Sequence, residues 1–222
     1  MNNKYKAVIF DLGDVYYRNG FKKVLSILVR KKKIRPSFLN EIFERSYIKK
    51  IEVNKISEKQ FWEEFKEDTG LIIKTVDLRK AVFEYFKPTP GMKKLVKLCR
   101  KNVKVGLLTN NIKEWFKIQE KKENFNKSFD KVLVSANIGL RKPGRKIYYL
   151  MAKKLKVKPS ECIFFDDALE NVKGAKKVGM KAFQFESAAL CTKKLNHLGI
   201  LESKSNTFRK VLDKKVKISA KG

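Results

Sequence analysis

Four segments of this 222-residue chain share one layout, in which a short apolar run is followed by polar residues and then by a helical pattern. They are VIFDLGDVYY from Val8, VKVGLLTNN from Val103, KVLVSANIG from Lys131 and ECIFFDDALEN from Glu161, and KAFQF from Lys181 is a further strand candidate. Apolar runs that alternate with amphipathic helices are typical of a parallel sheet covered by helices on both faces. The sequence therefore predicts an α/β fold built on a parallel sheet.

The stretch between residues 16 and 87 has a different pattern, because its apolar residues recur at helical spacing, as in SEKQFWEEFKEDTG. Ser57 and Gln60 form a capping box, and Gly70 is placed to end the helix. The sequence KPTPG that follows is typical of a rigid return to the core. We therefore predict a core of residues 1–15 and 88–200, an inserted α-helical cap of residues 16–87 and a basic C-terminal tail of residues 201–222.

The formal net charge of +30 favours anionic partners. The charge is spread along the whole chain, however, and comes mostly from Lys, whereas proteins that read nucleic acid rely on the planar fork of Arg. We therefore expect no nucleic-acid partner, and infer that the charge attracts small anionic substrates.

Cysteine spacing and hydropathy indicate the cellular compartment in which the protein is expected. Cys99, Cys162 and Cys191 lie at wide, unpatterned spacings, which favours reduced core residues over a disulfide framework. No apolar run approaches the roughly 18 residues that a membrane span requires. We expect a cytoplasmic monomer or homodimer without a membrane partner.

Polar residues follow the apolar runs at the points where the predicted strands end. In a parallel sheet these points meet at one edge, which is where ligands bind in such folds. An isolated Asp there is often a helix cap and an isolated Lys is usually solvated, but the set in this order indicates a site. Its members are Asp11, Thr109 with Asn110, Lys142, and the pair Asp166 and Asp167.

These groups fit phosphoryl transfer. A carboxylate oxygen of Asp11 can attack phosphorus, and Asp11 with Asp167 can hold Mg²⁺, a cation that prefers oxygen ligands. Thr109 and Asn110 would contact the phosphoryl group. Lys142 would offset the negative charge of the substrate and the nucleophile, and without cations the clustered carboxylates would repel one another.

Four motifs resemble those of the haloacid dehalogenase superfamily of aspartate-nucleophile hydrolases, over residues from Tyr5 to about Ile200. They are FDLGDV, LLTNN, GLRKPGRKIYY and IFFDDALENVKGAKKVGM, and the first resembles the FDLGxV branch, which includes sugar-phosphate phosphatases and the phosphatase domain of soluble epoxide hydrolase. The resemblance implies a Rossmann-like core, an α-helical cap inserted after the first strand, an Asp11 nucleophile that forms an aspartyl-phosphate, and required Mg²⁺. It also implies that the backbone carbonyl of Gly13 binds the metal and that Asp166 and Asn171 support the metal site.

The chain departs from the family pattern at Gly13, where phosphatases of the superfamily generally carry a second Asp that protonates the leaving group. Positioned acid–base catalysis is typically worth about 10²- to 10⁴-fold, so its loss matters least for a good leaving group such as that of a glycosyl or acyl phosphate. Asp14 is one candidate replacement. Neighbouring side chains after a strand point in different directions, however, so a cap on the following turn is its alternative role.

The leading hypothesis is a Mg²⁺-dependent phosphatase of a small phosphorylated metabolite, with a sugar phosphate as one candidate substrate. Carbon–halogen hydrolysis is an alternative, because dehalogenases of the superfamily also attack through Asp and lack the second Asp. A catalytically weak binding or regulatory protein with the same fold is a third reading, and Gly13 is its main support.

Overall fold

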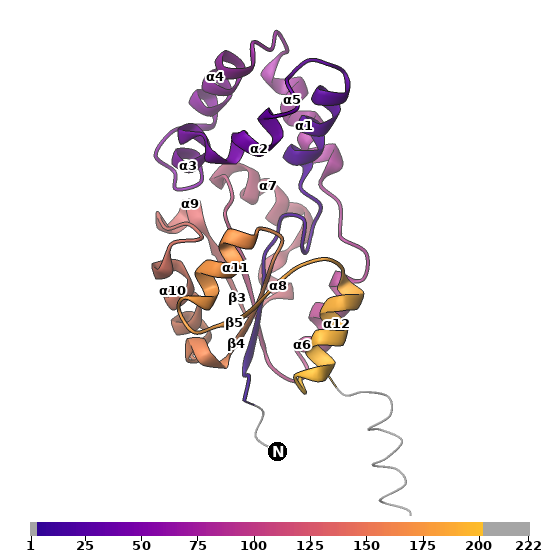
Figure 1. Ribbon diagram of the computed structural model, residues 1–222, viewed down its shortest axis with the longest axis vertical. Coiled ribbons are helices and arrows are strands. Elements are labelled where there is room, and N and C mark those ends of the chain that lie inside the picture. The colour runs from indigo at the N-terminus through magenta and orange to yellow at the C-terminus, as the bar shows by residue number, and fades with distance from the viewer. Residues whose placement is uncertain (1–3, 202–222) are drawn as a thin grey trace, which may run out of the picture.

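A computed structural model describes residues 4–201 of the chain, and five parallel strands form its central sheet in the order β3-β2-β1-β4-β5 (Figure 1). The first strand lies at the centre, where Val8 is paired with Val105 of β2 and with Ile163 of β4. The strands are β1 (Ala7–Phe10), β2 (Lys104–Thr109), β3 (Lys131–Val134), β4 (Cys162–Asp166) and β5 (Lys181–Gln184).

Helices cover both faces of the sheet, as the alternating pattern predicts (Figure 1). All residues of β1 and β4 are buried, which is why both strands read as continuous apolar runs rather than alternating ones. One face packs against α6 (Met92–Cys99), α8 (Phe125–Ser128) and α12 (Ala188–His197). The other packs against α10 (Arg145–Leu155) and α11 (Leu169–Lys176). The predicted α/β architecture is confirmed.

The remaining helices of the core are one full-length helix and two short ones. They are α7 (Lys113–Glu123) after β2, α9 (Ser135–Ile138) directly after β3, and the 3₁₀ helix η2 (Pro159–Glu161) before β4. Cys99, Cys162 and Cys191 are buried and unpaired, as their spacing predicts.

Helices fill the segment between β1 and α6. They are α1 (Gly20–Arg30), α2 (Phe38–Glu41), the 3₁₀ helix η1 (Ile42–Glu44), α3 (Ser46–Ile51), α4 (Glu58–Thr69) and α5 (Thr75–Tyr85). The predicted capping box is confirmed, since the Ser57 side chain accepts a hydrogen bond from the Gln60 backbone N–H at the start of α4. Gly70 ends α4 in the left-handed conformation, with φ of 66°.

This helical segment has its own apolar core, to which Phe61, Trp62 and Phe65 of α4 contribute fully buried rings. Phe21 of α1 packs edge-on against all three rings. Gly20 lets α1 approach α5 closely, because a Cβ there would lie 1.9 Å from the Val82 carbonyl oxygen. Trp115 of α7 joins the same cluster, so the helical segment packs onto one core helix.

The chain enters and leaves this helical segment through two adjacent stretches. The Arg18 N–H donates to the Lys87 carbonyl at 2.9 Å, and the Thr89 N–H donates to the Tyr16 carbonyl at 3.1 Å. The rings of Tyr17 and Phe86 stack with centroids 4.5 Å apart. The ends of the segment are therefore held together beside the sheet edge.

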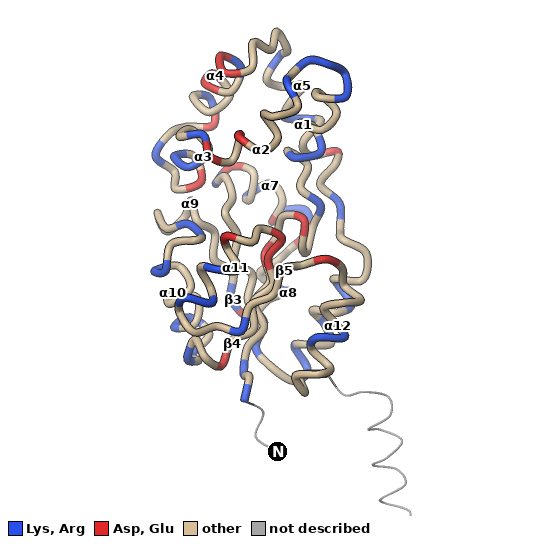
Figure 2. The backbone as a smooth tube through the Cα atoms, in the orientation of Figure 1, with Lys and Arg blue, Asp and Glu red and all other residues tan. Residues whose placement is uncertain are grey.

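Lys and Arg are spread over the sheet half and the helical half alike (Figure 2). The predicted basic tail, residues 201–222, lies outside the described residues apart from Leu201.

Candidate active site

The strand order brings the predicted polar residues to one edge of the sheet. Asp11 directly follows β1, Thr109 is the last residue of β2, and Asp166 is the last residue of β4. Because β1 lies between β2 and β4 in a parallel arrangement, these three side chains stand at neighbouring carboxyl ends. Lys142 reaches the same edge from the loop between α9 and α10.

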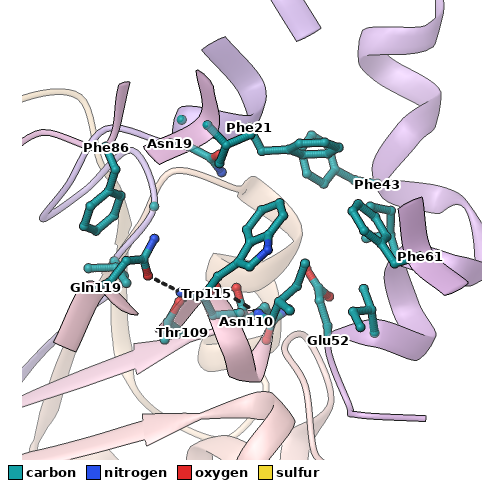
Figure 3. Close-up of a pocket in the computed structure, with 18 residues that line it drawn as sticks. Asn19, Phe21, Phe43, Glu52, Phe61, Phe86, Thr109, Asn110, Trp115 and Gln119 are labelled. Carbon is teal, nitrogen blue, oxygen red and sulfur yellow. Dashed lines mark hydrogen bonds between the residues drawn. The ribbon is translucent and has the colours of Figure 1, made fainter. Parts of the chain in front are cut away.

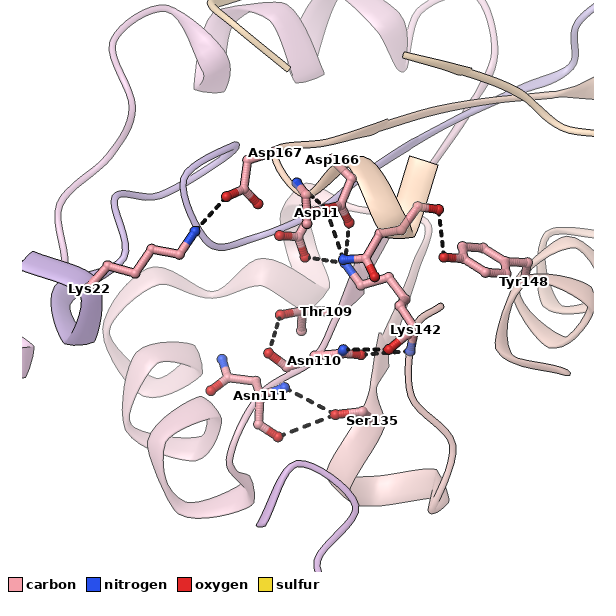
Figure 4. A network of polar contacts seen from close by, with 12 residues as sticks. Asp11, Lys22, Thr109, Asn110, Asn111, Ser135, Lys142, Tyr148, Asp166 and Asp167 are labelled. Atoms are coloured by element: carbon pink, nitrogen blue, oxygen red, sulfur yellow. Dashed lines mark hydrogen bonds and ion pairs between the residues drawn. The ribbon is translucent and has the colours of Figure 1, made fainter. Parts of the chain in front are cut away.

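Lys142 joins two of the carboxylates (Figure 4). Its Nζ donates to Asp11 Oδ1 at 2.6 Å and to Asp166 Oδ2 at 2.5 Å, and the residue is only 1% exposed. Although burial lowers the pKa of Lys142, the adjacent carboxylates of Asp11 and Asp166 raise it above its ordinary value. Lys142 therefore carries a buried positive charge at neutral pH.

Asp11, Asp166 and Asp167 each offer a carboxylate oxygen within 4.8 Å of the others, a geometry that could hold a metal ion. Burial raises the pKa of Asp11 to about 8, against the lowering effect of Lys142. Burial likewise raises the pKa of Asp167. The Lys142 ammonium alone thus does not neutralise the cluster, and a hard divalent cation with oxygen ligands fits the donor set.

Two amide side chains hold this arrangement in place. Asn110 Nδ2 donates to the Lys142 carbonyl at 3.0 Å, and Asn110 Oδ1 accepts from the Lys142 N–H at 2.9 Å. Asn171 Nδ2 donates to Asp166 Oδ1 at 3.0 Å, and the same oxygen accepts from the Ala168 N–H. Asn110 therefore fixes the loop that carries Lys142, and Asn171 fixes the carboxylate that Lys142 binds.

The turn after β1 holds Gly13 and Asp14. A Cβ at Gly13 would lie 3.3 Å from Asn19 Nδ2, so the Asn19 side chain occupies the adjacent space. Asp14 adopts a left-handed backbone with φ of 57°, and its Oδ1 accepts from the Asn19 N–H at 2.9 Å. The Asp14 carboxylate is thereby held against the start of α1.

Lys22 of α1 also enters the site, and no sequence pattern marks it. Its Nζ lies 2.6 Å from Asp167 Oδ2 (Figure 4). The same nitrogen lies 3.0 Å from Asp14 Oδ2. A cation in the first turn of a helix is disfavoured by the helix dipole, so these carboxylates are what make the position favourable. Carboxylates that follow the strand ends thus receive cations from both the core and the helical segment.

A cavity of about 90 Å³ lies between the helical segment and the sheet edge (Figure 3). Thr109, Asn110 and Glu52 line it toward the sheet, and Phe21 and Phe43 line it on the far side. Among the described residues that line the cavity, Glu52 alone has an ionisable side chain. Glu52 follows α3 directly and is the second site residue that the sequence did not single out.

The sequence and the structure of this chain resemble those of known proteins. The family model of haloacid dehalogenase-like hydrolases matches residues 5–179. A glyceraldehyde 3-phosphate phosphatase of Pyrococcus furiosus is 36% identical over 108 residues, which span 47% of this chain and 44% of that protein. A D-ribitol-5-phosphate phosphatase of Bacteroides thetaiotaomicron is 24% identical over 193 residues, which span 83% of this chain and 93% of that protein.

A solved structure shares the fold. It is a HAD family enzyme of Bacteroides thetaiotaomicron in complex with magnesium and inorganic phosphate, with a TM-score of 0.63 and 20% identity over 82% of this chain and 95% of that one. Within residues 4–201, no helix has the length and apolar character to cross a membrane. With the family model covering 5–179 of 222 residues and the motif residues meeting at one sheet edge, the chain belongs to the haloacid dehalogenase-like hydrolase family.

Proposed function

We propose that the protein is a Mg²⁺-dependent phosphatase of a small phosphorylated metabolite. The observation that carries the proposal is the buried pairing of Asp11 with Lys142 beside Asp166 and Asp167. It supplies a nucleophile, a fixed positive charge and a metal-binding donor set at one sheet edge. Relatives named as phosphatases of glyceraldehyde 3-phosphate and D-ribitol 5-phosphate support the same class of reaction.

Each residue has a defined part in this reaction. Asp11, Asp167 and the Gly13 carbonyl would hold Mg²⁺, which supplies positive charge next to the phosphoryl oxygens when bound. A carboxylate oxygen of Asp11 attacks phosphorus and forms an aspartyl-phosphate, which water then hydrolyses. The Lys142 ammonium orients Asp11 and offsets negative charge as it develops, while Thr109 donates its hydroxyl to the phosphoryl group.

The cavity supports a small substrate with hydroxyl groups. Its volume of about 90 Å³ suits a small organic group. The amides of Asn19, Asn110 and Asn111 line it beside aromatic rings. Asn110 and Asn111 are each held by protein groups at both ends of the amide, whereas Asn19 Nδ2 can donate to a substrate hydroxyl. A sugar or polyol phosphate fits this lining, and a glycosyl phosphate also has a leaving group that tolerates Gly13.

The test is phosphate release from sugar phosphates, polyol phosphates, acyl phosphates and p-nitrophenyl phosphate, with Mg²⁺ or with EDTA. We expect release that falls at least about 100-fold in EDTA and returns on addition of Mg²⁺. A mock purification from the same host sets the background. Release that survives EDTA, or folded protein without release on the whole panel, would contradict the proposal.

Lys22 provides a prediction about metal affinity. Mg²⁺ must compete with the Lys22 ammonium for Asp167, so Lys22→Met is expected to bind Mg²⁺ more tightly, by up to about fivefold for this partly exposed pair. Isothermal titration calorimetry without substrate measures the effect. Lys23→Met is the matched control, because Lys23 is exposed on the next position of the same helix. Unchanged or weaker affinity in Lys22→Met would show that Lys22 does not compete with the metal.

A further inference from the structure

We propose that Glu52 supplies the proton that a side chain at position 13 cannot supply, so that the helical segment contributes an acid–base group to the site. The proposal rests on the proposed phosphatase function and adds to it the group that acts on the leaving oxygen. It is carried by where Glu52 lies, by how it is bound and by the absence of another ionisable side chain among the described residues that line the cavity.

The cavity connects Glu52 with the reacting end of the site. The residues that line it include Gly13 and Thr109, which belong to the sheet edge, and Glu52, which belongs to the helical segment. Figure 3 shows Glu52 on the same side of the cavity as Asn110 and Thr109. A substrate whose phosphoryl group contacts Thr109 would place its leaving group in this cavity, whose lining includes Glu52.

Glu52 is held in place through one of its two oxygens. Arg141 Nε and Nη2 both lie 2.8 Å from Glu52 Oε2, and the Glu52 side chain is 14% exposed. Both contacts fall on Oε2, which leaves Oε1 as the oxygen that can meet a ligand. Arg141 adjoins Lys142 in sequence, so this pair also aligns the helical segment with the loop that holds the buried ammonium.

The surroundings favour the protonated form of Glu52 more than those of an exposed glutamate do. Burial raises the pKa of Glu52, and this outweighs the lowering effects of Arg141, Lys142 and Lys49. An acid of this kind can donate a proton and take it back within one catalytic cycle.

The proton transfers balance over two steps. In the first, an Asp11 oxygen bonds to phosphorus, the bond from phosphorus to the leaving oxygen breaks, and that oxygen takes its electron pair and the Glu52 proton to give an alcohol. In the second, water gives a proton to the Glu52 carboxylate and bonds to phosphorus. The bond from phosphorus to Asp11 then breaks, which restores the Asp11 carboxylate and the Glu52 acid. The alcohol and the water occupy the same side of phosphorus, so one carboxyl can serve both.

Asp14 is the competing candidate. Its carboxylate is held by the Asn19 N–H and lies 3.0 Å from Lys22 Nζ, and it does not line the cavity that Glu52 lines. Both oxygens of Asp14 are thus engaged, Oδ1 by the Asn19 N–H and Oδ2 by Lys22 Nζ, which suits a turn cap more than a proton donor. The two candidates can be separated by experiment, because their variants make opposite predictions.

The experiment measures kcat/KM with Mg²⁺ on phenyl phosphate and p-nitrophenyl phosphate, two esters of similar shape with a poor and a good leaving group. We expect Glu52→Gln to lose about 100-fold on phenyl phosphate and less than about fivefold on p-nitrophenyl phosphate. The alkaline limb of the kcat/KM profile on phenyl phosphate should also change, because the acid must be protonated to act. Glu44→Gln serves as the control, because Glu44 is an exposed glutamate of the same helical segment and pairs with Lys49.

Two further variants exclude a merely structural role. Arg141→Gln breaks the same ion pair but keeps the carboxyl, so it should retain the wild-type ratio between the two esters. Equal losses on both esters in Glu52→Gln, or a selective loss on phenyl phosphate in Asp14→Asn, would overturn the assignment to Glu52 while wild-type turnover still upholds the phosphatase. Wild-type protein that releases no phosphate with Mg²⁺ would contradict the phosphatase itself and this proposal with it.

Discussion

Asp11→Asn is expected to lower phosphate release at least about 10⁴-fold, because the amide cannot form the covalent intermediate on which the two-step reaction depends. The measurement is steady-state phosphate release with Mg²⁺ on the best substrate of the panel. Acid quenching of wild-type protein with ³²P-labelled substrate should trap label on the chain, and the Asp11→Asn variant should trap none. Release within about tenfold of wild type would assign the nucleophile elsewhere.

The Asp11→Asn substitution should leave the fold intact. The structure also predicts how it changes the dependence of stability on pH. Burial raises the pKa of Asp11 to about 8, so the native state binds more protons than the unfolded state between the ordinary Asp pKa and that value. This contribution makes wild-type stability fall as pH rises through that window when metal is absent. In Asp11→Asn the contribution is missing, so denaturation in EDTA at pH 6 and pH 8.5 should show a smaller loss of stability than in wild type.

Lys142→Met is expected to damage both turnover and stability. The side chain is buried and binds Asp11 at 2.6 Å and Asp166 at 2.5 Å. Removing one partner of a buried ion pair typically costs about 3–5 kcal/mol, which corresponds to a fall in Tm of roughly 10 °C for a chain of this size. Phosphate release should fall at least about 10³-fold, because the fixed charge beside the nucleophile is lost.

The Tm of Lys142→Met in the presence of Mg²⁺ tests whether charge neutralisation is the cause of the lost stability. A bound divalent cation neutralises the same carboxylates, so saturating Mg²⁺ should restore part of the lost Tm in Lys142→Met but little of the activity. Lys146→Met is the matched control, because Lys146 is exposed on α10, and it should change neither quantity. A Lys142→Met protein with wild-type Tm in EDTA would show that this ammonium does not neutralise the buried carboxylates.

The sheet could be predicted from the sequence because its signal is local. Each observed strand coincides with a segment that marked it to within one residue. Asp11, Thr109 and Asp166 stand at the carboxyl ends of β1, β2 and β4, at one edge of the sheet. The capping box at Ser57 and the glycine that ends α4 are also written in a few adjacent residues. The position of Asp11 relative to Asp166 follows from strand order alone, since β1 and β4 are neighbours.

Lys22 and Glu52 could not be predicted because their positions depend on packing between distant segments. A Lys on an amphipathic helix has the same spacing whether it meets solvent or Asp167, a residue 145 positions away. The orientation of Asp14 depends on its left-handed backbone conformation. The presence of an Asp in the sequence does not predict that conformation, because Asp adopts it only occasionally. A sequence pattern does not specify how the helical segment packs against the sheet, and the positions of Lys22 and Glu52 depend on that packing.

The two hydrogen-bonded stretches at Arg18–Lys87 and Tyr16–Thr89 have a consequence for how such proteins diversify. A segment whose ends already meet can be lengthened, shortened or exchanged for another without shifting strand order, because loop closure costs rise only slowly with length. The groups that follow the strand ends would keep their places through such an exchange, whereas Lys22, Glu52 and the rings of Phe21 and Phe43 would be replaced together. A single recombination event could thus change the substrate specificity of such a protein. The carboxylates at the sheet edge would be unchanged.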